Sequence, residues 1–378
     1  MKKRIGITAA ILAASCAILA TGCAGNTQNV VYLSSNWYAN TGYKKIQPTF
    51  TEKDEKFSPE KIIYDVKHDK TSADNDNYSV EYADGTYTTE FYAVNFDKNS
   101  EYVAEEYRSG YPEKQVVYCY KTELSIPSVT FKYGAESKVF DEGDKVITES
   151  YFLSVENRLR PLYSYQKINS VSPNMLNPKS LEECYSKNSY EYKTYYSYDG
   201  KSATTHLIGV EAIPEDNFSN KKNFDLNSAP STFFDVSYLD VAVRANRLSA
   251  DLAEGVCLIT PSSGLQNFIL RGGVDSLSDK EKSAAQEVLK KKGLYTPKYY
   301  KDEDGNEKEK GLSTVAVRVS YNGELTGVLQ TYWISAIENA RNNTGRATIV
   351  RMDNHVTFKQ GILRYSIKEV ESTLWIDK

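Results

Sequence analysis

The chain has 378 residues, a length that predicts about two domains but also fits a single large all-β domain. Hydrophobic residues make up 40% and include 30 tyrosines against 13 phenylalanines, while charged residues make up the ordinary share of 25%. These proportions exclude a wholly disordered chain and a polytopic membrane protein. The excess of tyrosine, which is amphipathic and favours strands, predicts a sheet-rich protein.

Residues 1–22 have the order of a bacterial export signal. A basic stretch at residues 2–4 precedes an uncharged apolar run at residues 5–19, which is shorter than the ~20 residues of a membrane-spanning helix. The run ends in Leu19-Ala20-Thr21-Gly22-Cys23, which resembles the lipobox of bacterial lipoproteins, although Ala20 replaces the usual leucine. The resemblance implies cleavage before Cys23, a diacylglyceryl group on its thiol, and anchoring to the extracytoplasmic side of the membrane.

Two alternatives to this interpretation stay open: a plain secretory signal with an incidental cysteine, and lipidation at Cys16 after a shorter apolar run. Cleavage before Cys23 lowers the basic residues from 46 to 43 against 50 acidic ones, which gives a net charge of −7. An acidic surface repels phosphate backbones, so nucleic acid is excluded as a partner. Cys119, Cys184 and Cys257 form neither a disulfide framework nor a CxxC zinc motif, and we expect reduced, mostly buried thiols.

The remaining chain divides into a tether and one body. Residues 23–59 are polar and predict a lipid-anchored tether with an irregular N-terminal segment. Residues 60–378 predict a single large β-rich extracytoplasmic domain, in which strands recur with turn signals between them. Asp84-Gly85, Asp199-Gly200 and Asn322-Gly323 each follow an alternating run and predict hairpins. A looser hairpin is predicted at residues 261–264, and a solvated loop at residues 301–310.

Two helices are predicted. Ser278 and Glu281 have the spacing of a capping box, and the helix that they begin is expected to end at Gly293. Residues 237–253 carry apolar side chains at helical spacing, although part of this run also alternates as a strand does.

The order of these elements suggests a fold. A helix at residues 237–252, a hairpin, a charged insertion, a strand at residues 330–334 and a final strand at residues 361–367 are similar to bacterial envelope proteins of the lipoprotein-carrier half-barrel type. That resemblance rests on element order and implies an apolar concavity for acyl chains or a similar ligand. We therefore expect a mainly β fold, with a large curved antiparallel sheet or open half-barrel packed on one or two helices.

Catalytic motifs are not found. His68, His206 and His355 lie too far apart in sequence to share one helix face, so local metal-ligand spacing is absent, and neither a GxSxG elbow nor a calcium loop is present. We expect no cofactor and no catalysis, although two carboxylates that meet in space would suffice for a glycosidase.

Aromatic residues are the remaining positive signal. Period-two geometry places Tyr190, Tyr192, Tyr196 and Tyr198 on one strand face, where they can stack on sugar rings, line an amphipathic pocket or pack the sheet. Trp333 is a further candidate ligand-lining residue, although its apolar neighbours favour a place in the core. The sequence thus predicts a membrane-anchored binding module for a lipid, glycan or protein ligand. A glycan-active protein and a passive surface scaffold are the alternatives.

Overall fold

The computed structural model describes residues 8–9, 14–15, 56–70, 77–155, 158–212, 220–226, 233–235, 238–245, 253–260, 264–295, 297–321, 327–335 and 348–372. The predicted lipidation site at Cys23 and the predicted tether up to residue 55 lie outside the described residues.

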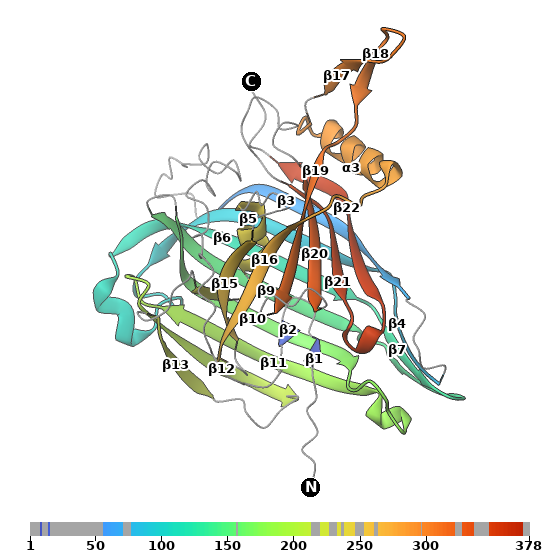
Figure 1. The fold of residues 1–378 in the computed structure, drawn as a ribbon. Helices are drawn as coiled ribbons and strands as arrows, with labels where there is room; N and C mark the ends of the chain where they lie inside the picture. Colours follow the sequence, from blue (N-terminus) through green and yellow to red (C-terminus); the bar gives the residue numbers. More distant parts are fainter. Residues whose placement is uncertain are drawn as a thin grey trace.

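One large sheet of fifteen strands dominates the fold (Figure 1). Its order is β13-β12-β11-β10-β9-β6-β5-β3-β22-β21-β20-β19-β16-β15-β14, and all neighbours are antiparallel except the parallel pair β14–β15. Pairing of β3 with β22 joins an N-terminal arm to a C-terminal arm, while the edge strands β13 and β14 are not paired with each other in the described strands. The predicted mainly β fold with an open, curved antiparallel sheet is confirmed.

The strands of the N-terminal arm are β3 (Lys56–Asp69), β5 (Gly85–Asp97), β6 (Lys114–Ile126), β9 (Asp144–Val155), β10 (Arg158–Pro173), β11 (Tyr185–Tyr196), β12 (Ser202–Ala212) and β13 (Lys221–Asp225). Those of the C-terminal arm are β14 (Phe233–Asp235), β15 (Ala253–Thr260), β16 (Gly264–Gly273), β19 (Thr314–Tyr321), β20 (Val328–Ser335), β21 (Ile349–His355) and β22 (Ile362–Ser372). Apart from the parallel pair β14–β15, each arm is a succession of antiparallel neighbours, which is what the frequent turn signals of the sequence predict.

Smaller elements surround this sheet. A three-stranded sheet consists of β4 (Tyr78–Tyr82), β7 (Val129–Tyr133) and β8 (Glu136–Phe140), and two-stranded pairs are β1–β2 (Thr8–Ala9, Ala14–Ser15) and β17–β18 (Lys298–Lys301, Glu307–Lys310). Within the described ranges, the helices are α2 (Leu239–Ala245) and α3 (Asp279–Lys291), with short 3-10 turns η2 (Glu105–Gly110), η3 (Leu181–Glu183) and η7 (Thr357–Lys359). Residues 301–310 are exposed, as predicted, but they form most of a β-hairpin instead of the predicted irregular loop.

Most turn predictions are confirmed. The strands flanking Asp199-Gly200 pair as β11–β12, and Gly200 has a φ of +73°. The pairs β15–β16 and β19–β20 also form, although residues 261–263 and 322–326 between them lie outside the described residues. The capping box of α3 is present, and Gly293 ends the helix with a φ of +67°.

Two sequence predictions are wrong. The strands around Asp84-Gly85 do not form a hairpin, because β4 pairs with β7 whereas β5 pairs with β3 and β6. Gly85 serves a close approach instead of a turn, since a Cβ there would lie 2.5 Å from the carbonyl oxygen of Ser125. The second helix, predicted over 237–253, is present as α2 (Leu239–Ala245), but Ala253 belongs to strand β15; residues 246–252 lie outside the described residues.

The sheet curls around α2. Asp240 of α2 accepts hydrogen bonds from Tyr87 on β5 and Tyr332 on β20, whose strands are four inter-strand steps apart in the sheet. Four steps span roughly 19 Å in a flat sheet, so two tyrosines can meet one carboxylate only where the sheet is strongly curved. We call the side that holds α2 the inner face. Arg351 of β21 lies next to the inward Met352 and contacts Glu281 of α3, so α3 packs on the outer face.

The outer face of the N-terminal arm carries a second core. A row of directly paired residues crosses β5, β6, β9, β10 and β11, namely Tyr92, Cys119, Tyr151, Tyr163 and Tyr195. Residues 98–113 cover this row with further aromatic side chains, among which Tyr102 stacks on Tyr151 at 4.7 Å between ring centroids. Much of the unusual tyrosine content is thus used for packing on both faces of one sheet.

Candidate binding site

The inner face is organised around a buried carboxyl group. The hydroxyl of Tyr87 donates to Oδ2 of Asp240 at 2.7 Å, and the hydroxyl of Tyr332 lies 3.0 Å from Oδ1. Burial raises the pKa of Asp240, while the hydrogen bonds from these tyrosines act in the opposite direction. Asp240 therefore fixes α2 to both arms of the sheet at once.

One helical turn further along α2, a buried ion pair fixes the helix to β3. The guanidinium of Arg244 contacts Glu60 with two nitrogens, at 2.9 Å from Oε1 and 3.4 Å from Oε2. Both side chains are only 1% exposed. Because Asp240 and Arg244 are four residues apart, they lie on the same side of the helix and anchor it to strands of the sheet.

Tyr238 attaches the start of α2 to the N-terminal arm. Its hydroxyl lies within hydrogen-bond distance of the carbonyl oxygens of Tyr151 on β9 and Tyr163 on β10. The register of β9 and β10 shifts between Pro161 and Tyr163, at a residue with no backbone N–H to donate. Tyr238 supplies a donor at this interruption of the ladder.

Beside α2, the inner face of the N-terminal arm is unusually polar. One row of directly paired residues across β6, β9, β10, β11 and β12 carries only hydroxyl side chains: Tyr120, Ser150, Ser164, Thr194 and Thr205. The next row includes Thr122 and Thr148, whose hydroxyl oxygens are 2.6 Å apart, followed by Gln166. All of these side chains are buried, so the interior is a polar surface where an apolar one is usual.

In the row of hydroxyl side chains that begins at Tyr120, two neighbouring hydroxyls have no hydrogen-bond partner within the described part of the chain. They belong to Ser150 and Ser164, which are directly paired and both 0% exposed. Further along β10, the hydroxyl of Ser170 and Oδ1 of its cross-strand neighbour Asn188 are in the same situation. A buried polar group without a partner costs about 1–3 kcal/mol, so these positions are suited to a bound molecule that supplies hydrogen bonds.

The four predicted tyrosines do not stay together. Tyr190, Tyr192 and Tyr196 are at most 3% exposed and lie on the inner face, with Tyr190 and Tyr192 stacked at 6.3 Å. Tyr198 lies beyond the end of β11, after the chain has begun to turn, and so does not share this face. It packs at 5.1 Å against Tyr111 of the outer core. The prediction that the four tyrosines share one face is thus correct for Tyr190, Tyr192 and Tyr196 and wrong for Tyr198. Any contact of these residues with a ligand stays a prediction.

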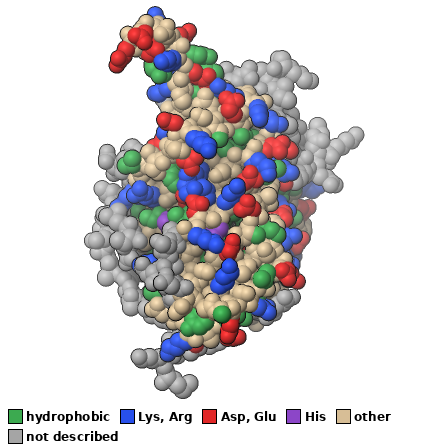
Figure 2. Space-filling view, turned by 90° about the vertical axis from the view of Figure 1, so that its right-hand side faces the viewer, with side chains coloured by type: hydrophobic (Ala, Val, Ile, Leu, Met, Phe, Trp, Pro, Cys, Tyr) green, Lys and Arg blue, Asp and Glu red, His purple; other side chains and the backbone are tan. Residues whose placement is uncertain are grey.

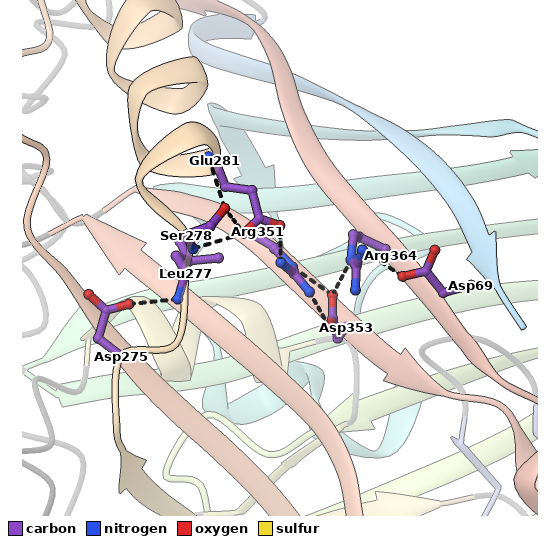
Figure 3. A network of polar contacts seen from close by, with 8 residues as sticks. All are labelled: Asp69, Asp275, Leu277, Ser278, Glu281, Arg351, Asp353 and Arg364. Atoms are coloured by element: carbon purple, nitrogen blue, oxygen red, sulfur yellow. Dashed lines mark hydrogen bonds and ion pairs between the residues drawn. The ribbon is translucent and has the colours of Figure 1, made fainter. Parts of the chain in front are cut away.

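Trp333 lies away from the tyrosines, on the outer face beneath α3. Its ring is 4.6 Å from the guanidinium carbon of Arg351, and the side chain is 5% exposed. Arg351 in turn bonds Asp353 at 2.8 Å and contacts Glu281 of α3, in a chain of charges that continues through Arg364 (Figure 3). Trp333 is therefore part of the attachment of α3 to the sheet.

The sequence reasoning missed the central residues of the inner face, Glu60, Asp240 and Arg244. A signal for two of them exists, because Asp240 and Arg244 are the charged residues of an otherwise apolar helical stretch at residues 239–245. Charges at i and i+4 on the buried side of a helix require buried partners.

Several other features bear on chemistry. Cys119 and Cys184 are buried free thiols, and burial raises their pKa to about 12 and about 11, so neither is a reactive thiolate near neutral pH. Within the described ranges, no group of three or more His, Cys, Asp or Glu side chains could hold a metal ion. No described helix is both long and apolar enough to cross a membrane.

Comparisons with known proteins give a distant structural likeness and no family. No protein-family model matches the sequence, and no curated protein matches it either. A solved structure described as a beta-barrel-like protein of domain of unknown function DUF1849 from Brucella abortus is similar over 83% of this chain and 98% of its own, at 8% identity and a TM-score of 0.41. A likeness at this level assigns neither family nor function.

Proposed function

We propose that the chain is a membrane-anchored extracytoplasmic lipoprotein that binds an amphipathic ligand on its inner face without catalysis. The observation that carries the proposal is the pair of buried, unpartnered hydroxyls at Ser150 and Ser164. A polar group of the ligand would bond these hydroxyls. Its apolar part would reach the inner-face row of Val146, Ile168 and Tyr190, which lies one row beyond Thr148 and Gln166.

The contacts of the buried acidic side chains support a role without catalysis. The described buried carboxylates are Glu60, Asp144, Asp240 and Asp353, and each is bound by a guanidinium, a tyrosine hydroxyl or a backbone N–H. A glycosidase needs two carboxyl groups that face a substrate with space between them. The partners of these four acids hold them in structural contacts instead.

Ligand binding is tested by native mass spectrometry of the purified full chain, together with titration by a fluorescent fatty acid. We expect a co-purifying small molecule and a fluorescence response that the double substitution Ser150→Ala, Ser164→Ala weakens about tenfold, the equivalent of one lost hydrogen bond to a buried group. Ser125→Ala on the neighbouring strand β6, at an exposed position, is the matched control and should change nothing. Absence of both the bound molecule and the response would reject the binding proposal.

The anchor has its own test. Replacing Cys23 by serine removes the thiol that the lipobox resemblance assigns to the diacylglyceryl group, and stable anchoring depends on such chains. We expect the Cys23→Ser protein to be found in the soluble extracytoplasmic fraction, whereas the unaltered chain stays in the membrane fraction. Fractionation of cells that express each form measures the difference. Cys16→Ser is the control and should leave membrane retention intact. Unchanged retention of the Cys23→Ser protein would contradict the lipoprotein assignment.

A further inference from the structure

The two unpartnered hydroxyls of the inner face belong to a row of five hydroxyl side chains. Tyr120, Ser150, Ser164, Thr194 and Thr205 are directly paired across neighbouring strands. A hydroxyl both donates and accepts hydrogen bonds, so a group that fully satisfies Ser150 and Ser164 must itself offer a donor as well as an acceptor. A hydroxyl of a bound molecule meets both needs, whereas the oxygens of an ester or a carboxylate only accept.

The described buried charges around this row offer no counter-charge to an anionic group. Among the described buried side chains of the inner face, Glu60, Asp144 and Asp240 are acidic and Arg244 is basic. Two nitrogens of the Arg244 guanidinium are bound by Glu60. Other lysine and arginine side chains are spread over the outer surface among acidic ones, as the face drawn in Figure 2 shows. A carboxylate or phosphate at the two serines would therefore be buried without a cation, which is unfavourable.

The groups at the two ends of the row point the same way. Tyr120, directly paired with Ser150, hydrogen-bonds the carboxyl group of Asp240, which in its ionised form would repel a second anion at the serine. At the other end, Lys222 of β13 is half-buried, and its ammonium group lies 5.8 Å from the centroid of the Phe224 ring. That contact directs Lys222 toward the adjacent row, so the hydroxyl row itself is uncharged.

Given the binding function proposed above, we propose that the ligand is an uncharged amphiphile whose head group carries a hydroxyl, as in a monoacylglycerol. The head group is held at Ser150 and Ser164 by hydrogen bonds alone, and the acyl chain extends toward the row that contains Ile168. A fatty acid or an anionic phospholipid is disfavoured because its charge has no partner there. An ester without a hydroxyl is disfavoured because it has no donor.

Equilibrium dialysis of the purified full chain, with bound lipid quantified by mass spectrometry, tests this preference. Monodecanoylglycerol, decanoate, methyl decanoate and decyltrimethylammonium have chains of equal length and differ in the head group, and each is used below its critical micelle concentration. At mildly alkaline pH we expect monodecanoylglycerol to bind at least about tenfold more tightly than the other three, the equivalent of one hydrogen bond to a buried group.

The double substitution Ser150→Ala, Ser164→Ala separates recognition of the head group from general affinity. We expect the preference for monodecanoylglycerol over methyl decanoate to fall to about twofold or less, because the groups that distinguish the two heads are gone. Binding of methyl decanoate should stay nearly unchanged, which also shows that the variant folds. Ser125→Ala, at an exposed position of β6, is the matched control and should keep the full preference.

Two results would overturn this ligand class and leave the proposed binding function intact. Tighter binding of decanoate than of monodecanoylglycerol is the first, and its loss in the Lys222→Met variant would assign the head group to that lysine. Tighter binding of decyltrimethylammonium is the second, since the buried acids would then select the ligand. Binding of none of the four compounds would instead reject the ligand class and the proposed function together.

Discussion

Replacing Arg244 with methionine is expected to lower the free energy of unfolding by about 3–5 kcal/mol, because the substitution leaves the Glu60 carboxylate buried without its cation. Both side chains are 1% exposed, so water cannot replace the lost partner. Urea denaturation of the purified chain at neutral pH, followed by circular dichroism, measures the difference.

A second substitution distinguishes the cost of an unpaired buried Glu60 carboxylate from the cost of losing the packing of the Arg244 side chain. In the double variant Glu60→Gln, Arg244→Met neither side chain of this pair is charged, so we expect most of the lost stability to return. Lys70→Met is the surface control: Lys70 pairs with Glu81 at 2.9 Å, but both side chains are at least 50% exposed, and the change should cost less than about 1 kcal/mol. Equal stability of the Arg244→Met protein and the unaltered chain would refute the role of this ion pair.

Elements that depend on neighbours in sequence were predictable. The capping box of α3 and the hairpin at Asp199-Gly200 each need residues only a few positions apart, and both form. The pairing of β4 was not predictable in this way. Its partner β7 begins about 50 residues later, and Gly85 is required by a contact with Ser125 that no local pattern reveals.

The contacts on the inner face could not be predicted from the sequence. Alternation correctly placed Tyr190 and Tyr192 on a common face, but it could not say that α2 would cover that side of the sheet. The partners of Arg244 and of the Tyr238 hydroxyl are 184 and at least 75 residues away in the chain, so their contacts exist only once the sheet has curled. The candidate site consists almost entirely of such long-range contacts.

The stability of the protein is expected to fall as pH rises from about 4 to about 7 because of Asp144. This carboxyl group is 1% exposed, and burial raises its pKa from 3.8 to about 7, against the hydrogen bond that it accepts from the Val171 N–H at 2.8 Å. In that pH interval the folded chain holds a proton that the unfolded chain has released, so folding is favoured less as pH rises. Above pH 7 both states are ionised and the effect is constant.

The Asp144→Asn variant isolates this effect, because asparagine keeps the oxygen that accepts from Val171 and cannot ionise. Relative to the unaltered chain, its free energy of unfolding should be similar near pH 4 and higher by up to about 4 kcal/mol at pH 8. Asp199→Asn provides the opposite sign: the Ser197 hydroxyl lowers the pKa of Asp199, so that variant should lose stability at neutral pH, and the loss should shrink as the pH falls below 3.8. A difference between Asp144→Asn and the unaltered chain that is flat from pH 4 to pH 8 would show that Asp144 is ionised throughout. The inner face next to β9 would then have to be far more polar than the burial of this side chain implies.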